Sequence, residues 1–586
     1  MQRRSLLKLL GLAAAAQLPA AAARLPAAAA IPDDRGITKT EPGPAFFFNQ
    51  IGYLPRESKV ATVTGSGAND LTFRLLRSPD DAVVFRGTLS AATPDAASGD
   101  LVRQASFSAF RTPGRYRLEA GGQRSEMFSI DPAVYAPALR LTMRAFYGQR
   151  CGCAVDLGGG YKHATCHPAG EYHASSGKSG TLPNSGGWHD AGDYGRYVVN
   201  SGITCGTLLM AWEQYAPALR NLRLDIPATQ PRLPDFLAEV LWNLQWMMSM
   251  QDEDGGVFHK QTSEKFCAFV MPEQDTLTSE VVGTGSDPYK STCATADFAA
   301  VMAMAARCYA EFNAPLAATC LHAARRAWTW ATTHPKIVFK NPPGVSTGEY
   351  GDANCSDELL WASAEMWRTT GEKPYEDAFL GSLPHDLANL NIDAPSWGNV
   401  AAMGYWTYAL ATRPGKEDVQ TAIRAATKRE AAKLADRSAG NGYGNTLGAG
   451  DYGWGSNSSA ANHAMLLTMA YQFDANDAAV AAAFNNLHYL LGRNCHGVSW
   501  VTQLGTRPFQ HPHHRPSAAD SLREPWPGLL SGGPNARPAD PAARTLKDLP
   551  PMRMWMDDER AYSMNEVAIN WNAPLVFLLA FANARR

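Results

Sequence analysis

The sequence changes character once, at Asp131-Pro132, and this change constrains the fold more than any other feature. Before it, short runs of β-branched and aromatic residues are separated by Gly, Pro, Asp and Ser. That pattern is typical of short strands joined by turns. After it, the strong segments carry apolar residues at helical spacing. The chain therefore combines a small β-rich part with a much longer helical part.

The β-rich part has the size and turn content of a small β-sandwich. Thr112-Pro113-Gly114 is a turn signal placed directly before one of its runs. We predict a sandwich over residues 44–131. Its clearest strands are expected at Val60–Val63, Phe73–Leu76, Val83–Phe85 and Arg115–Leu118.

The helical part is expected over residues 137–586. Long Gly-, Pro- and Asn-rich loops join its helices, with turn clusters such as Asp252–Gly256. Paired helices with long loops favour an α/α toroid over a bundle, and loops gathered at one end could line a cleft. The clearest helical patterns cover 236–248, Ala294–Tyr309, Leu316–Trp330, Leu359–Trp367, Asn462–Tyr471 and Val567–Ala582.

The first thirty residues are interpreted as a signal peptide. Gln2–Lys8 contains a twin-arginine pattern, and a short apolar stretch from Leu9 to Ala23 follows it. A membrane anchor is the alternative, but Gln17 and Pro19 interrupt the apolar stretch. We predict export by the twin-arginine route to the periplasm or the medium, with no membrane attachment after cleavage.

Composition excludes several classes of protein. A net charge of −2 provides no basic field, so a nucleic-acid partner is not expected. Ten cysteines in 586 residues do not resemble a disulfide scaffold and fit metal binding better. The sequence gives no indication of oligomeric state.

Asp190 and Asp193 lie in the stretch Gly-Gly-Trp-His-Asp-Ala-Gly-Asp-Tyr that ends at Tyr194. Two neighbouring carboxylates can orient and deprotonate one water. The small residues between them allow close approach to the backbone. The alternative is a helix N-cap with a second acid in the first turn.

Glu566 precedes an apolar helix and has Tyr562, Met564 and Val567 nearby in sequence. Partial desolvation there would raise its pKa, as a general acid requires. In the alternative, a first-turn Glu complements the helix dipole and its pKa is lowered.

Two long motifs lie in the helical part. The first runs from Trp555 to Ala573, and the second runs from Ser499 and ends in His513-His514-Arg515. Both resemble the signatures of glycoside hydrolase family 9, the inverting cellulase family. The resemblance extends from Pro137 to the C-terminus, and the β-rich part resembles the immunoglobulin-like module of one branch of the family. The first motif matches at Trp555, Asp557, Tyr562, Glu566, Ala568, Asn572 and Ala573.

This resemblance implies an Ig-like β-sandwich followed by an all-α (α/α)6 catalytic toroid. It implies an endoglucanase that hydrolyses β-1,4 bonds of cellulose-type glucans with inversion. Asp193 would be the general base with Asp190 on the same water, and Glu566 would be the general acid.

The resemblance also suggests substrate-binding residues. His513 and Arg515 match positions that bind sugar hydroxyls beside the cleavage point. Asp557 and Tyr562 match supporting positions. Without the resemblance, residues 513–515 would be interpreted as a solvated basic loop. Trp454 and Tyr350 are candidate sugar-stacking platforms, with core packing as the alternative.

Cys151, Cys166, His167 and His189 are a candidate closed zinc site, which is the structural rather than the catalytic pattern. Cys153 and His163 are rival ligands by sequence alone. The resemblance favours the first four, and zinc would then hold the loop that carries Asp190.

Asp352, Asp357 and Glu358 are candidate calcium ligands. Family 9 members often bind calcium near such an Asp-Glu-Leu stretch. However, the more distant Asp of the family pattern is missing, because Ser396-Trp397-Gly398-Asn399 stands in its place.

Two other functions are compatible with the sequence. One is an exo-acting β-glycosidase on cello- or chito-oligosaccharides. The other is a non-catalytic carbohydrate-binding protein, which the complete set of Asp190, Asp193 and Glu566 disfavours. A β-glucan polysaccharide or oligosaccharide is the expected partner.

Overall fold

The computed structural model describes residues 46–65, 71–184, 186–227 and 232–585. The predicted signal peptide, 1–30, lies outside these residues. Within them, no helix is both long and apolar enough to cross a bilayer.

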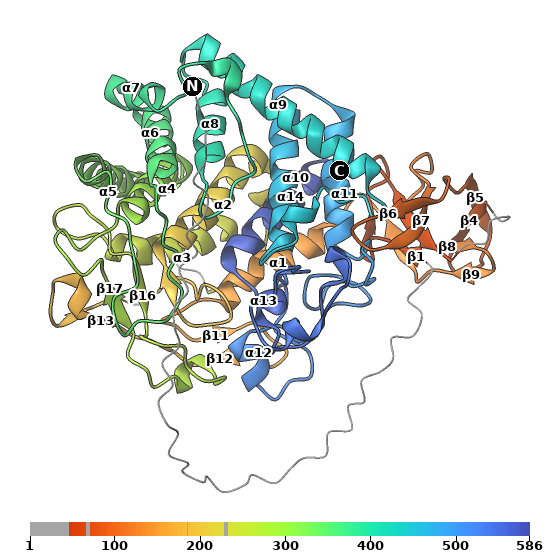
Figure 1. Cartoon of the computed structure of the whole chain (residues 1–586), viewed down its shortest axis with the longest axis horizontal. Helices are drawn as coiled ribbons and strands as arrows, with labels where there is room; N and C mark the ends of the chain where they lie inside the picture. The colour runs from red at the N-terminus through yellow and green to blue at the C-terminus, as the bar shows by residue number, and fades with distance from the viewer. Residues whose placement is uncertain (1–45, 66–70, 185, 228–231, 586) are drawn as a thin grey trace, which may run out of the picture. The chain divides into compact units, whose positions relative to one another are not determined.

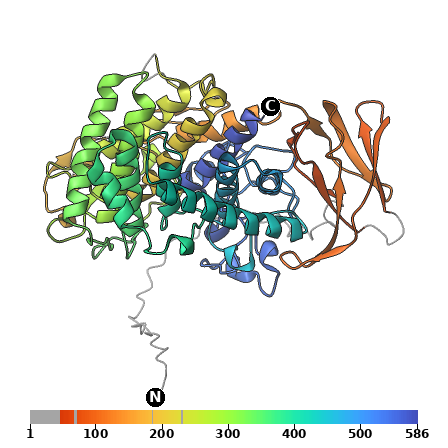
Figure 2. The ribbon, with the colours of Figure 1, turned by 90° about the horizontal axis from the view of Figure 1, so that it is seen from above.

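The N-terminal part is a sandwich of two sheets around its own core, as predicted. Phe73, Leu75 and Leu118 point into this core, and β4 and β8 pair antiparallel with Leu75 opposite Leu118. Figures 1 and 2 show these strands, from red to orange, beside the helices. One sheet has the order β1 (Phe46–Phe47), β3 (Val60–Thr64), β7 (Asp100–Ser106) and β6 (Thr93–Asp95); the other contains β2 (Gly52–Tyr53), β10 (Phe128–Ile130), β8 (Gly114–Ala120), β4 (Thr72–Arg77), β5 (Val83–Thr88) and β9 (Gln123–Arg124).

The helical part begins with α1 (Ala136–Gly148). Because β10 ends at Ile130 and α1 begins at Ala136, we propose that the domains divide between these two residues.

The helices form an inner and an outer set. The inner helices are buried on most sides, whereas the outer helices expose one face. In the described chain each inner helix packs on an outer helix: α14 on α1, α2 on α3, α4 on α5, α6 on α7, α8 on α9, and α10 on both α11 and α9. This pairing is that of an (α/α)6 toroid. The inner helices are α2 (Val198–Leu219), α4 (Thr292–Tyr309), α6 (Ser356–Thr370), α8 (Ala401–Ala409), α10 (Ser456–Phe473) and α14 (Ile569–Ala584). The outer helices besides α1 are α3 (Asp235–Ser249), α5 (Ala314–Thr333), α7 (Lys373–Gly381), α9 (Glu417–Gly440) and α11 (Asp477–Leu490).

The connections carry short elements that position the site. A five-stranded sheet has the order β14-β13-β17-β16-β15. In Figure 1 several of these strands, with β11, β12, α12 and α13, lie at the same end of the helices. The short elements are β11 (Val155–Asp156), β12 (Lys162–His163), β13 (Gly170–Tyr172), β14 (Thr181–Leu182), β15 (Arg196–Tyr197), β16 (Lys260–Thr262), β17 (Glu280–Val282), α12 (Arg515–Ala519) and α13 (Tyr562–Asn565).

Buried polar contacts join the sandwich to the helices. Arg493, only 2% exposed, donates through Nε to Thr62 Oγ1 of β3 at 3.1 Å and also bonds Gln104 of β7. Asn49 Nδ2 lies 3.0 Å from His488 Nδ1 of α11. Because these contacts remove polar groups from water, each donor and acceptor in them needs its hydrogen-bond partner.

Candidate active site

Asp190 and Asp193 lie in the loop before β15, not at a helix terminus. The backbone N–H of Asp190 donates to Gly195 O at 2.9 Å, and α2 begins only at Val198. The N-cap alternative therefore does not apply. The turn instead presents both carboxyl groups to a cleft.

Three segments far apart in sequence are joined at this turn by backbone hydrogen bonds. Ile569 N donates to Asp190 O at 2.8 Å, and Arg515 N donates to Gly192 O at 3.1 Å. His513 forms an isolated parallel bridge with Glu566. The approach is so close that a Cβ on Gly192 would lie 1.9 Å from His513 O. Glycine is required there because the backbone of His513 lies so close.

The two aspartates have different partners. Tyr350 Oη donates to Asp190 Oδ2 at 2.6 Å, and Asn200 Nδ2 donates to Oδ1. Asp193 Oδ2 accepts from Gly195 N at 3.0 Å and from Tyr197 Oη at 3.2 Å. No hydrogen bond to Asp193 Oδ1 is found among the described residues, which leaves that oxygen available to a water.

Burial raises the pKa of both aspartates. The pKa of Asp190 rises to about 7, because burial and then the charge of Asp193 outweigh the hydrogen bonds from Tyr350 and Asn200. Burial also raises the pKa of Asp193, although Arg515 opposes this rise.

Glu566 lies between α13 and α14, so it is not a first-turn residue of the long C-terminal helix. Its carboxylate Oε2 accepts a hydrogen bond from Trp454 Nε1 at 3.0 Å. Burial, followed by the charges of Asp193 and Asp190, raises the pKa of Glu566 to about 8. A carboxyl with this pKa is protonated at neutral pH and can donate its proton.

All three carboxyl groups face one cleft of about 820 Å³. Its walls are polar and aromatic, with Trp397, Trp454 and Trp571 among the residues that line it. Trp454 is 50% exposed, so it is not a core residue. The volume and the rings suit a chain of several sugar residues.

The four residues predicted to bind substrate, His513, Arg515, Asp557 and Tyr562, are not among those that line the cleft. Arg515 is buried and donates through Nη1 to Gly192 O at 2.8 Å and through Nη2 to Cys267 O at 3.0 Å. The solvated-loop alternative is therefore wrong for Arg515. His513 contacts the rings of Phe269 and Tyr562, at 5.0 and 5.6 Å between centroids.

Asp557 orders the loop that leads to His513. Its Oδ2 accepts from Gln510 N and its Oδ1 from His511 N, both at 2.8 Å. The Tyr562 ring lies 5.6 Å from that of Trp454, beside Glu566. The roles of all four residues in substrate binding stay predictions.

The predicted zinc ligands Cys151, Cys166, His167 and His189 have ligand atoms that all lie within 4.8 Å of one another. The two sulfurs are 4.0 Å apart. His167 Nδ1 is 3.7 Å from Cys151 Sγ, and His189 Nε2 is 3.7 Å from Cys166 Sγ. A tetrahedron with metal–sulfur bonds of about 2.3 Å has edges of about 3.8 Å, so the donors fit a zinc ion.

The surroundings of this cluster also fit a structural metal. His167 Nε2 lies 3.4 Å from Asp275 Oδ2, the carboxylate–histidine arrangement that orients metal ligands. The rivals Cys153 and His163 do not belong to the four-residue cluster. Because His189 adjoins Asp190, a metal bound by the cluster would fix one end of the carboxylate turn.

The predicted calcium ligands are arranged less favourably. Asp352 Oδ1 accepts from Asn354 N at 2.9 Å, and Asp357 Oδ2 accepts from Val400 N at 2.8 Å. In the described chain Asp352, Asp357 and Glu358 do not form a cluster with ligand atoms within 4.8 Å of one another. Glu358 is fully buried, and neither of its oxygens has a hydrogen-bond partner by geometry among the described residues. Burial, followed by the charges of Asp297 and Asp357, raises its pKa to about 11.

Comparison with known proteins agrees with this geometry. The family description "Glycosyl hydrolase family 9" matches residues 135–579, and "Cellulase N-terminal ig-like domain" matches residues 41–125. The chain belongs to glycosyl hydrolase family 9.

Members of family 9 with high coverage include two curated enzymes. Endoglucanase D of Acetivibrio thermocellus is 36% identical over 91% of this chain and 82% of its own length. The xyloglucan-specific endo-beta-1,4-glucanase BoGH9A of Bacteroides ovatus is 34% identical over 93% of this chain and 95% of its own. A solved structure, the zinc-binding triple mutant of the family 9 endoglucanase J30, superposes with a TM-score of 0.85 at 35% identity, covering 90% of this chain and 99% of that one.

The family 9 motifs did not indicate the residues that hold the carboxylates. Tyr197, Asn200 and Gln149 were not predicted. Gln149 Nε2 donates to Ala191 O at 2.9 Å, and its Oε1 lies 3.0 Å from His514 Nε2. Nothing in the sequence distinguishes these three from other polar residues, because their roles depend on how α1 and α2 are packed.

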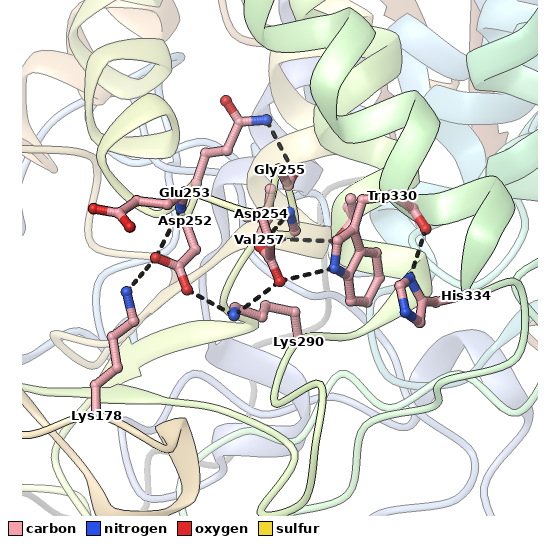
Figure 3. Close-up of polar contacts among 12 residues, drawn as sticks. Lys178, Asp252, Glu253, Asp254, Gly255, Val257, Lys290, Trp330 and His334 are labelled. Carbon is pink, nitrogen blue, oxygen red and sulfur yellow. Dashed lines mark hydrogen bonds and ion pairs between the residues drawn. The ribbon is translucent and has the colours of Figure 1, made fainter.

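Two lysines hold the turn cluster predicted at Asp252–Gly256. Lys290 Nζ bonds Asp252 Oδ2 at 2.6 Å and Asp254 Oδ2 at 3.2 Å, and Lys178 also pairs with Asp252 (Figure 3). Although burial raises the pKa of Asp252, the two ammonium groups lower it overall. The turn leads into β16, which pairs with β15 and so holds Tyr197 beside Asp193.

Proposed function

We propose that the protein is an inverting endo-β-1,4-glucanase that acts on cellulose-type β-glucans. The observation that carries this proposal is the convergence of Asp190, Asp193 and Glu566 on one cleft, with the pKa of Glu566 raised to about 8. The names of the endoglucanase relatives support the same activity and linkage.

In the proposed reaction, Glu566 donates its proton to the glycosidic oxygen as the bond to the anomeric carbon breaks. Asp193 accepts a proton from a water that attacks this carbon from the opposite face. Asp190, held by Tyr350 and Asn200, orients the same water. Attack from the opposite face inverts the configuration of the anomeric carbon.

We propose zinc as the ion held by Cys151, Cys166, His167 and His189. The donor spacing supports this, as does the relative described as a zinc-binding mutant. Four protein ligands close the coordination sphere, so the ion would supply folding free energy rather than chemistry.

We also propose that the protein binds calcium and that it is exported. The buried carboxyl of Glu358, which has no hydrogen-bond partner among the described residues, supports a bound cation, although its oxygens do not cluster with those of Asp352 and Asp357. We propose export by the twin-arginine route from the Arg3-Arg4 pattern. Equilibrium dialysis with ⁴⁵Ca and fractionation of expressing cells test these two points.

Product analysis on cellohexaose tests the proposed activity. We expect early release of several product sizes, as internal cleavage requires, and a loss of about 10²- to 10⁴-fold in kcat for Asp193→Asn. Release of a single small product from the start would instead indicate the exo-acting alternative. Tight binding without any hydrolysis would indicate a carbohydrate-binding protein.

A further inference from the structure

Trp454 combines two features: its ring is accessible from the cleft, and its indole N–H is hydrogen-bonded. Half of the residue is exposed. Its indole N–H nevertheless donates to Glu566 Oε2 at 3.0 Å, across 112 positions of sequence. A residue that only offered a surface for sugar stacking would not need this bond.

The backbone fixes this contact. Gly532 N donates to Glu566 O at 2.8 Å, and Gly532 O accepts from Asn457 N at 3.0 Å. The segments that carry Trp454 and Glu566 are therefore both bonded to one residue between them. Gly455 follows Trp454 with φ +85°, and a Cβ there would lie 3.0 Å from the Trp571 ring.

We propose that Trp454 is a positioning residue that selects which oxygen of Glu566 carries the catalytic proton. An N–H donor makes Oε2 a hydrogen-bond acceptor, so the acidic proton is held on Oε1. No hydrogen bond to Oε1 is found among the described residues, and Glu566 lines the cleft. This inference rests on the proposed role of Glu566 as the general acid.

The same bond assists the transfer itself. As Glu566 gives up its proton it becomes a carboxylate, and a hydrogen bond to a charged group is stronger than one to a neutral group. Trp454 therefore stabilises the product form of the acid and lowers its pKa, against burial and the charges of Asp193 and Asp190, which raise it. Arg515 also lowers this pKa. The Tyr350 hydroxyl is a further titratable group that interacts electrostatically with Glu566.

Trp454→Phe separates the two roles of the residue, because it keeps an aromatic ring and removes the N–H donor. We expect kcat to fall about 10-fold while KM changes less than about 2-fold, since stacking is retained. We also expect the alkaline limb of the pH–kcat profile to move up by roughly one pH unit, because an acid without its donor holds its proton to higher pH.

Trp397→Phe is the matched control. Trp397 also lines the cleft and contacts the Tyr350 ring at 5.2 Å, but it has no hydrogen bond to Glu566. We expect the alkaline limb of the pH–kcat profile of Trp397→Phe to match that of the wild type. Trp454→Ala should show the shift of Trp454→Phe together with a higher KM.

The outcomes separate this inference from the proposed function. An unmoved alkaline limb and an unchanged kcat in Trp454→Phe, with only KM raised, would overturn the inference and leave Trp454 as a stacking platform. If Glu566→Gln, measured in parallel, keeps wild-type kcat, the proposed function itself fails.

Discussion

At the scale of single residues, the geometry of the candidate site depends on Gly192 as much as on the carboxylates. Gly192 has no side chain, yet its position lets the turn of Asp190 and Asp193 contact the segment of His513. The close approach allows Arg515 to bond Gly192 O twice, through its backbone N–H and its guanidinium. A side chain that fills this space should therefore displace Asp193, the proposed general base.

Gly192→Ala tests this point. An added Cβ would lie 1.9 Å from His513 O, a backbone atom that cannot move aside alone. We expect at least about a 10²-fold loss of kcat, because small displacements of catalytic groups are costly. Gly440→Ala in α9 is the control, since nothing lies within 4 Å of its added Cβ. Equal activity of the two variants would show that the contact at Gly192 is unimportant.

At the scale of elements, the cysteine–histidine cluster connects the loops after α1 to the carboxylate turn. Cys151 follows α1, and Cys166-His167 lie on the loop after β12. His189 N donates to Gln149 O at 2.7 Å, and Asp190 follows His189 directly. A bound ion would therefore hold the turn through one peptide unit.

Cys166→Ser should lower bound zinc from one ion per chain to substoichiometric levels, measured by mass spectrometry of metals. We expect a loss of several kcal/mol in the free energy of unfolding, because metal binding to a closed site contributes to folding. Cys320→Ser, which changes a buried thiol of α5 outside the cluster, should keep its zinc. Full zinc content in Cys166→Ser would contradict the proposed ligand set.

At the scale of the whole molecule, the sandwich and the toroid meet through buried polar contacts around Arg493. Its guanidinium bonds Thr62 and Gln104 of the sandwich and Asn485 Oδ1 of α11, the last at 2.9 Å. Arg493→Ala would remove this donor from the buried Thr62 hydroxyl and from the half-buried Gln104 and Asn485. A buried polar group left unpaired costs about 1–3 kcal/mol.

We accordingly expect Arg493→Ala to lower the free energy of unfolding by about 2–5 kcal/mol in urea titrations, with little change in kcat of the folded enzyme. Arg77→Ala removes an exposed ion pair with Asp80 and should leave the urea midpoint nearly unchanged, because solvent screens such pairs. Similar midpoints for the two variants would mean that the interface contributes little to stability.

Much of this architecture could be predicted from the sequence, for physical reasons. Strong apolar periodicity located α3, α4 and α5 within a few residues, and alternation located β3 and β4. The pattern did not reveal α9, because few of its 24 residues are large and apolar and much of it is exposed. The Cys293–Cys355 disulfide was also not predicted, since 62 residues separate the two cysteines.

The candidate site was also only partly predictable from the sequence. Motif spacing indicated Asp190, Asp193 and Glu566, and the structure places them at one cleft. Their partners Tyr197, Asn200 and Trp454 depend on the packing of α2, β15 and the segment before α10, which no local pattern encodes.

The stereochemistry of hydrolysis is the most direct test of the proposed inverting mechanism. Proton NMR of cellohexaose hydrolysis, recorded from the first minutes, distinguishes the anomer released first before mutarotation mixes the two. We expect initial α-anomer from the wild type and very little product from Glu566→Gln, because an attack assisted by Asp193 on the face opposite Glu566 inverts the anomeric carbon. Initial β-anomer, or undiminished hydrolysis by Glu566→Gln, would contradict this mechanism.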